Sequence, residues 1–470
     1  MTETTNSQQP EGGSPRPADS AVRAGAAAEA LGTRPVGRLL WGATAQATVA
    51  VATYGLYALT NAWFVARGVG ADAFAAVNIV APVLLILGAV ATTVGTGGAS
   101  LVSRSLGAGD TRQAARAAGN AFFVYWATAA VVAVAGTLAL DPLLTLLGAT
   151  AETRDYAYDY GLIILAGAVT ATGFSSLVRA EGSMRYSTLL WVAPLGCQIL
   201  LDPLLIYGFG LGVRGAALGT VGGQLVSLAL SLWFFFGKRD RPYRITRADL
   251  RPHGPTLRQL VSVGSPSFLA GFGGTLVVAL ANNLLVARGG ATAVGAYAIC
   301  ARIGTIALMP HMGISQGMQP LIGYNAGRGL AERVRRTHTL ALRASVVYGT
   351  AACLLLLAAA GPVTGALADE ADVHGTATDA LRILALGYPL AGVPMLIAAY
   401  FQALGRARPS YLISIGSLVA IRMPLLLVLS PFGTTWLWLA FPLADGTAAA
   451  AALLVLHRRA GPAGLPKTFG

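Results

Sequence analysis

Long apolar runs, separated by short polar segments, fill the chain from about residue 39 to residue 456. Runs such as 189–207 and 216–236 contain about 20 residues, the length that an α-helix needs to cross the hydrocarbon core of a bilayer. Since lipid offers no hydrogen-bond partner, each run must pair its own backbone groups as a helix. A transmembrane β-barrel is excluded, because its strands alternate apolar and polar residues. The pattern therefore predicts an all-α polytopic membrane protein.

The predicted spans number twelve and fall into two blocks of six. The first block comprises residues 39–66, 74–101, 119–140, 157–178, 187–208 and 215–236. The second block comprises residues 262–286, 294–324, 338–360, 380–403, 410–430 and 434–456. We expect two lobes, an N-lobe at residues 37–236 and a C-lobe at residues 257–457, joined by a basic linker at residues 237–256. Residues 1–36 are too polar to bury a core and are predicted to be a flexible tail, with a second tail at residues 458–470.

Composition and charge support this topology. Hydrophobic residues make up 55% of the chain and charged residues 11%, whereas a soluble domain carries roughly 25% charged residues. Lys and Arg are retained on the cytoplasmic side during insertion. With both termini inside, the basic residues that fall outside are Arg67, Arg154, Arg214, Arg288 and Arg382. The net charge of +13 thus reflects topology and does not indicate nucleic-acid binding. We expect a monomer in the bacterial cytoplasmic membrane, in contact with lipid, with both termini in the cytoplasm.

The two blocks carry an internal repeat at an offset of about 221 residues. The matching pairs are Asn61–Gly68 with Asn282–Gly289, Gly107–Asp110 with Asn325–Arg328, Arg179–Gly182 with Gln402–Gly405, and Asp202–Leu205 with Met423–Leu426. Because each copy has an even number of spans, both copies cross the membrane in the same sense and are related by a pseudo-two-fold axis along the membrane normal. Two bundles related in this way can rock against each other to give alternating access, so the repeat predicts a transporter.

Motifs in both blocks carry a family resemblance. They are the segments 98–110, 201–206, 212–220, 316–325 and 441–445. At these motifs the chain, over residues 37–460, resembles the multidrug and toxic compound extrusion (MATE) family, and the Gln319-Pro320 pair resembles its bacterial drug-export branch. The resemblance implies twelve helices in two lobes and efflux driven by a transported proton or sodium ion, with no cofactor.

The resemblance also implies a cation-coupling site in the N-lobe. The family aspartate of span 5 and threonine of span 6 are matched by Asp202 and Thr220, whereas Asn61 replaces the aspartate of span 1 and Gln198 replaces an asparagine of span 5. Ser175 is our candidate for the polar member from span 4. A central charge costs roughly 2.5–3.5 kcal/mol in insertion scales, which favours a functional carboxylate at position 202. The alternative is that Asp202 only bonds backbone groups freed by the following proline.

The substrate-binding candidates are Asp445, Tyr57, Tyr297, Gln319 and Arg302. Asp445 could bind a substrate cation or pair with Arg422, and the sequence leaves both open. Arg302 is expected to bond a carboxylate or a carbonyl, since intramembrane charges seek partners. The two tyrosines could offer π faces to an organic cation.

These features predict a secondary antiporter that exports small organic cations by alternating access. The alternative is a flippase for a lipid-linked precursor or a dedicated natural-product exporter, which would use a more cationic cavity, and Arg302 and Arg422 are the residues that suggest it. An enzyme is disfavoured, because the predicted spans contain no His-Glu-x-x-His motif and no paired catalytic aspartates.

Overall fold

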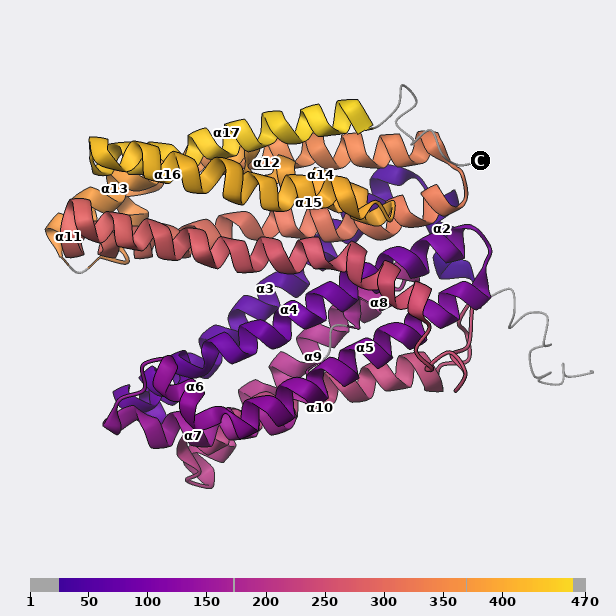
Figure 1. Cartoon of the computed structure of the whole chain (residues 1–470), viewed down its shortest axis with the longest axis horizontal. Helices are drawn as coiled ribbons and strands as arrows, with labels where there is room; N and C mark the ends of the chain where they lie inside the picture. The colour runs from indigo at the N-terminus through magenta and orange to yellow at the C-terminus, as the bar shows by residue number, and fades with distance from the viewer. Residues whose placement is uncertain (1–24, 172–173, 369, 460–470) are drawn as a thin grey trace, which may run out of the picture.

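The computed structural model describes residues 25–171, 174–368 and 370–459, and these ranges are nearly all helical (Figure 1). The first half contains α2 (Ala26–Thr33), α3 (Val36–Gly68), α4 (Ala71–Gly107), α5 (Thr111–Leu138), α6 (Leu140–Leu146), α7 (Ala151–Ala166), η1 (Gly167–Thr170), α8 (Ser175–Ala180), α9 (Met184–Pro203), η2 (Leu204–Gly208), α10 (Gly212–Leu232) and η3 (Trp233–Gly237). The second half contains α11 (Gly254–Gly327), α12 (Ala331–Gly365), α13 (Ala371–Ala385), α14 (Tyr388–Ala403), α15 (Ala407–Gly416), η4 (Ser417–Arg422), α16 (Met423–Leu429), η5 (Ser430–Phe432) and α17 (Thr434–Arg459).

The described helices make twelve membrane spans. Ten described helices are long and apolar enough to cross a bilayer when α11 is counted once, and α13 with α14, bent by 52°, forms an eleventh span. Division of α11 into two helices gives the twelfth. The 74-residue α11 would be about 110 Å long if it were straight, far more than a bilayer requires. It is two helices joined at Gly290, whose φ of 63° breaks the helix. Spans 3 and 9 start at Thr111 and Ala331, earlier than predicted, because the helices continue beyond the apolar stretch that hydropathy detects.

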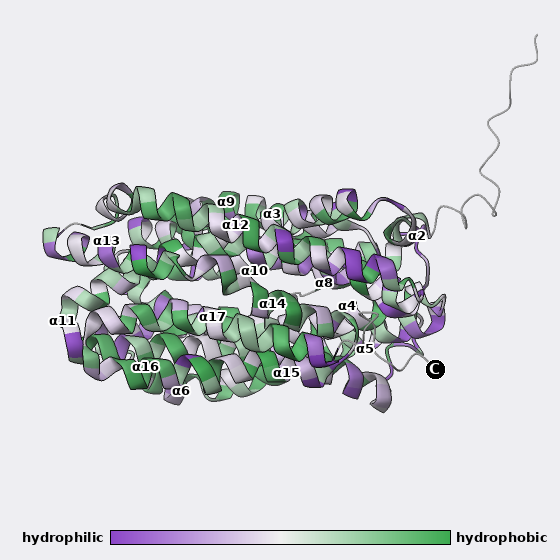
Figure 2. Ribbon diagram, turned by 90° about the horizontal axis from the view of Figure 1, so that it is seen from above, coloured by the Kyte–Doolittle hydropathy of each residue, from purple (hydrophilic) through white to green (hydrophobic). Residues whose placement is uncertain are grey.

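The spans form two six-helix lobes that meet at one end of the bundle and diverge at the other (Figure 1). The end at which they meet carries α2, residues 238–253 of the linker and the last residue of α17, and we call it the linker end. Figure 2 shows hydrophobic residues along most of the length of the helices, with hydrophilic residues gathered near the linker end. The fold class predicted from the sequence is therefore confirmed.

Backbone contacts close the linker end between the lobes. A Cβ placed on Gly107 of span 2 would lie 2.0 Å from the carbonyl oxygen of Tyr324 in span 8. The contact repeats around the pseudo-two-fold axis, because a Cβ on Gly327 would lie 2.0 Å from the carbonyl oxygen of Arg104. Only glycine permits such close approach of two helices. The hydroxyl of Ser100 adds a hydrogen bond to the carbonyl oxygen of Gln402, 2.5 Å away.

Exposure along span 8 shows that the lobes separate away from the linker end. Arg302, Ile306, Met309, Gly313 and Gly317 follow one another at helical spacing and lie on one face of this span. That face points to the N-lobe, since Met309 contacts Gly55 and the last two residues contact span 1. Ile306 is 67% exposed, whereas Gly313 and Gly317 are buried. The chain is therefore in a conformation that is closed at the linker end and open at the opposite end.

Helix α2 corrects the prediction that residues 1–36 form a flexible tail. Residues 26–33 are helical, with Ala28 and Leu31 buried in a hydrophobic core that both lobes share. The Asn325 side chain and the Arg333 guanidinium both donate to the carbonyl oxygen of Leu31, each at 3.0 Å. On the N-lobe side, a Cβ on Gly182 would lie 2.2 Å from the carbonyl oxygen of Ala27. Helix α2 therefore bridges the lobes. Residues 1–24 of the first predicted tail and 460–470 of the second lie outside the described residues.

The linker is anchored to the N-lobe by a buried ionic cluster that the sequence did not predict. The guanidinium of Arg241 pairs with Glu181, and both side chains are 2% exposed. Tyr243 donates a hydrogen bond of 2.5 Å to the same carboxylate. Burial and the neighbouring carboxylate raise the pKa of the Tyr243 hydroxyl well above its ordinary value, so the phenol keeps its proton. At the other end of the linker, Asn120 accepts a hydrogen bond from the backbone amide of His253 at 2.8 Å.

Replacing Arg241 by Ala is expected to destabilise the protein, because it leaves the Glu181 carboxylate buried and unpaired. Breaking one partner of a buried pair costs about 3–5 kcal/mol of unfolding free energy. The measurement is thermal unfolding of the detergent-solubilised protein. The matched control is Arg335→Ala, which removes an exposed pair with Glu332 and should cost no more than about 1 kcal/mol. Equal melting temperatures for the two variants would contradict the anchoring role.

Replacing Gly107 by Ala is expected to open the linker end, because the new methyl group collides with the backbone carbonyl of Tyr324. Spin labels on Arg112 and Arg336, which are exposed at the linker end of different lobes, report the separation in a background without the native cysteines. Their distance distribution should gain a longer population in this variant. Gly88→Ala in the same helix is the control, since its Cβ would meet nothing within 4 Å. Identical distributions for both variants would refute the closure by Gly107.

Candidate functional site

The N-lobe holds a sealed polar cluster around Asp202. The side-chain nitrogen of Asn61 in span 1 lies 3.5 Å from Asp202 Oδ2, 3.3 Å from Thr220 Oγ1 and 3.4 Å from the carbonyl oxygen of Ala216. Asp202 and Gln198 are both 0% exposed and lie one helical turn apart in span 5. The structure therefore brings together four of the five predicted coupling residues, from spans 1, 5 and 6.

Several buried polar atoms of the cluster lack hydrogen bonds. In the described part of the chain, Asp202 Oδ1 and both amide atoms of Gln198 are buried without a hydrogen-bond partner. The prediction that Asp202 serves only to bond backbone groups finds no matching hydrogen bond among the described residues. A buried ionised carboxylate with an unpaired oxygen is costly. The geometry favours a neutral or cation-occupied carboxyl in this conformation.

The local sequence interrupts the α-helix immediately after the acid. Asp202 precedes Pro203, which has no backbone N–H, and the chain then makes a π-helical segment at Leu204–Gly208. Such segments rotate the following residues relative to an α-helix and are frequent at functional sites. Gly219 of span 6 lies against the carboxyl, because a Cβ there would be 2.0 Å from Oδ1. The close packing of spans 5 and 6 thus seals the acid.

Two tyrosines complete the N-lobe cluster. The hydroxyl of Tyr57 donates a hydrogen bond to the carbonyl oxygen of Thr220 at 3.0 Å, so this predicted substrate ligand lies at the coupling cluster. Tyr160 of span 4 is buried beside Thr220 and Asp202. The sequence analysis missed Tyr160, because the span was predicted to start at residue 157 and an aromatic residue near a span end is typical of interface anchoring.

Ser175 is not part of the cluster, and the prediction for this residue is corrected. Its hydroxyl accepts a hydrogen bond from the Trp191 indole at 3.1 Å, and its carbonyl oxygen accepts one from Ser187 at 2.9 Å. These bonds tie α8 to α9. The hydroxyl therefore serves helix packing, and Tyr160 is the span 4 residue that reaches the acid.

The C-lobe carries an ion pair between Arg422 of span 11 and Asp445 of span 12. The structure therefore selects the pairing alternative for Asp445 in this conformation. The ring of Tyr297 packs against Trp438 and Phe441, with centroids 6.1 and 5.7 Å apart, and lies next to the guanidinium. Tyr297 and Asp445 are the two predicted substrate ligands that the fold brings together.

The other two substrate candidates lie elsewhere. Arg302 is exposed on the face of span 8 that points to the N-lobe, and no ion pair or hydrogen bond involves it among the described residues, so the predicted tie is wrong. Gln319 lies near the closed linker end, about 33 Å along the helix from Tyr297. Both therefore lie apart from the C-lobe ion pair.

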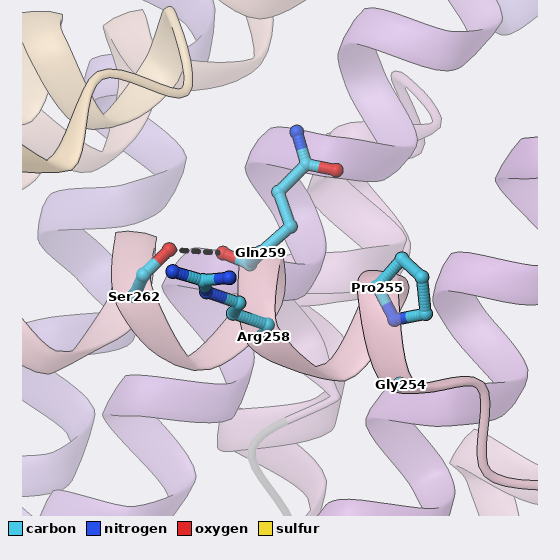
Figure 3. A pocket seen from close by; sticks show the side chains of 5 residues that line it. All are labelled: Gly254, Pro255, Arg258, Gln259 and Ser262. Atoms are coloured by element: carbon cyan, nitrogen blue, oxygen red, sulfur yellow. Dashed lines mark hydrogen bonds between the residues drawn. The ribbon is translucent and has the colours of Figure 1, made fainter.

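Two surface grooves lie apart from both charge clusters. One, of about 590 Å³, lies at the start of α11 and is lined by Gly254, Pro255, Arg258, Gln259 and Ser262 (Figure 3). The other, of about 540 Å³, lies between spans 1 and 5 and is lined by Leu59, Thr60, Trp63, Phe64 and Ile199. No predicted site residue lines either groove.

Two helical lobes with ionisable residues in their interiors define a polytopic membrane transporter. A family model described as MatE matches the chain twice, over residues 47–204 and 271–428, with one match in each lobe. The chain therefore belongs to the MATE family, which confirms the resemblance found in the motifs. The two matches also support the internal repeat.

Characterised relatives and solved structures agree with this assignment. The chain is 26% identical over 402 residues to the FAD transporter of Shewanella oneidensis, covering 83% of this chain and 87% of that protein. It is 27% identical over 417 residues to the multidrug export protein MepA of Staphylococcus aureus strain MSSA476, covering 86% and 89%. A crystal structure of MATE in the bent conformation has a TM-score of 0.86 at 24% identity, covering 91% and 96%. An outward-facing multidrug resistance MATE family transporter has a TM-score of 0.84 at 24% identity, covering 90% and 96%.

Proposed function

We propose that the protein is a secondary antiporter that exports small organic cations in exchange for protons or sodium ions. The observation that carries the proposal is Asp202, a carboxyl that is 0% exposed within a membrane span and has one oxygen without a hydrogen-bond partner among the described residues. Such a group is costly when ionised and unoccupied. Binding of a proton or a metal cation removes that cost, so occupancy of Asp202 favours the sealed state described here.

The sealed geometry links ion exchange to a conformational change. Asp202 can exchange its cation only when spans 1, 5 and 6 move apart, which links exchange to a change in the N-lobe. Because Asn61 is neutral, the cluster contains a single carboxylate, so we propose one coupling charge per cycle. Exchange of one coupling ion for one monovalent organic cation moves no net charge, so the concentration gradient of the ion, worth about 1.4 kcal/mol per tenfold ratio, drives export.

The same proposal places the protein in the bacterial cytoplasmic membrane as a monomer surrounded by lipid, with both termini in the cytoplasm. The basic linker and α2 then lie in the cytoplasm, in keeping with the positive-inside rule. The conformation described here is then outward-open. No resident cofactor is assigned, because the driving ion is itself transported.

A second candidate is a dedicated exporter of an anionic natural product or lipid precursor. A relative that is an FAD transporter favours it, since FAD carries phosphate groups. The exposed Arg302, which faces the N-lobe without a partner among the described residues, offers a positive charge between the lobes. Transport of a phosphate-bearing compound without transport of organic cations would select this candidate.

Replacing Asp202 by Asn is expected to abolish gradient-driven efflux, because the amide cannot exchange a proton or neutralise a cation. Proteoliposomes that contain the purified protein are loaded with ethidium, and its efflux is followed under separately imposed proton and sodium gradients. The rate should fall to the protein-free background, while the melting temperature stays close to that of the unmodified protein. Asp141→Asn, which changes an exposed acid in the pair with Arg154, is the matched control. Full efflux by the Asp202 variant would remove this residue from the mechanism.

A further inference from the structure

The ion pair in the C-lobe has an open side. The side chain of Arg422 is 32% exposed and that of Asp445 is 13% exposed. A guanidinium carries five N–H donors, and the hydrogen bond that Arg422 makes among the described residues uses one nitrogen, on Asp445 Oδ1. Arg104 Nη2 is buried and has no hydrogen-bond partner among the described residues. None of the nitrogens of Arg422 is in that position. Donors of Arg422 therefore remain available to a ligand.

Arg422 points into the lobe. It lies at the end of the π-helical segment η4, on the face of span 11 that also carries Leu418 and Leu426, both of which are buried. Leu418 packs against the first half of α11, because a Cβ on Gly273 would lie 2.5 Å from its side chain. The open donors consequently face other spans of the C-lobe and not the lipid.

Aromatic side chains lie beside these donors. Tyr297, Trp438 and Phe441 make a row of rings whose planes lie within 31° of parallel to the ring of Tyr297. Tyr388 lies close to Asp445. The hydroxyls of both tyrosines make no hydrogen bond among the described residues, and neither is a sealed atom. The three rings are part of the buried C-lobe core, whereas the two hydroxyls can donate to the same oxyanion that the guanidinium binds.

We propose that Arg422 is a specificity residue that binds an oxyanion, a carboxylate or a phosphate, on the transported organic cation. The inference rests on the proposed function and extends its substrate class to organic cations that also carry an oxyanion. Guanidinium binds such groups with two parallel charge-assisted hydrogen bonds. Asp445 holds Arg422 when the site is empty, and the substrate oxyanion replaces it. The coupling carboxyl of Asp202 is sealed in the N-lobe, so ion coupling and substrate recognition lie in separate lobes.

The test compares two dyes that share one chromophore. Rhodamine 123 is a cation whose carboxyl is esterified, and rhodamine 110 carries the free carboxylate. Fluorescence anisotropy with the purified full-length protein gives the affinity for each dye. The ratio used below is the affinity for rhodamine 110 divided by the affinity for rhodamine 123. Arg422→Gln should lower the affinity for rhodamine 110 relative to rhodamine 123 by about tenfold, the loss expected for one strong interaction. Arg422→Lys keeps the charge and should lower the ratio less.

Asp445→Asn separates binding from a structural role. It frees the guanidinium, so the ratio should rise in favour of rhodamine 110, opposite in sign to Arg422→Gln. If the pair is only structural, the two variants change both affinities together and the ratio stays constant, which overturns the proposal. The double variant Arg422→Gln with Asp445→Asn leaves no unpaired charge, so it supplies the ratio if the single variant does not fold. Its ratio should also be low.

Arg302→Gln is the control for a second guanidinium. A fall in the ratio with this variant, and none with Arg422→Gln, would assign the oxyanion to the space between the lobes and overturn the role of Arg422. Binding is measured without a gradient, so it is independent of the proposed antiport. Absence of rhodamine 123 efflux from proteoliposomes under either gradient would refute the antiport alone, whatever the anisotropy shows.

Discussion

The free-energy cost of a charge inside the bilayer determines the arrangement of this protein. The structure meets that cost differently in each lobe. In the N-lobe one acid, Asp202, is sealed among amide and hydroxyl groups that leave one of its oxygens unpaired. In the C-lobe the charges of Arg422 and Asp445 cancel as a pair. On the proposed function, a bound proton or cation stabilises the first arrangement. The second is neutral without a ligand, and Arg422 keeps donors that a ligand can use.

The second constraint is how closely two helices can approach. At the linker end the lobes touch through backbone atoms at Gly107 and Gly327, so closure depends on glycine and not on interlocking side chains. Such a contact is either made or broken, because a packed interface has little room for intermediate positions. Helix α2 accepts hydrogen bonds from the C-lobe and packs against Gly182 of the N-lobe, so it must leave one of them when the linker end opens. Opening of the linker end therefore breaks several contacts together.

Sequence predicted what local properties encode. Hydropathy located twelve spans, since lipid demands long apolar helices, and the repeat gave two lobes. The cost of a charge within an apolar span was enough to single out Asp202, Arg422 and Asp445. Long-range contacts escaped prediction. The Arg241–Glu181 pair joins residues 60 positions apart in two polar loops, where charge is ordinary, and nothing local distinguishes it. The prediction for Ser175 was wrong because the rotation of the helix in span 4 is not visible in its composition. Tyr160 was missed because its place near the predicted start of the span is typical of an interface anchor.

The repeat allows the two copies of one span, to which we assign different roles, to be compared. Asp202–Leu205 and Met423–Leu426 are equivalent, and in both copies a proline follows and a π-helical segment lies beside it. In the second copy the acid is replaced by Met423, and a basic residue appears one position earlier. One residue is a rotation of about 100° on a helix, so the charge faces a different neighbour as well as having the opposite sign. Span 12 supplies the balancing acid at position 445, and the C-lobe thereby gains a paired charge at which a ligand can compete. On the proposed roles, divergence at positions 422, 423 and 445 separates cation coupling from ligand selection in lobes that otherwise share one architecture.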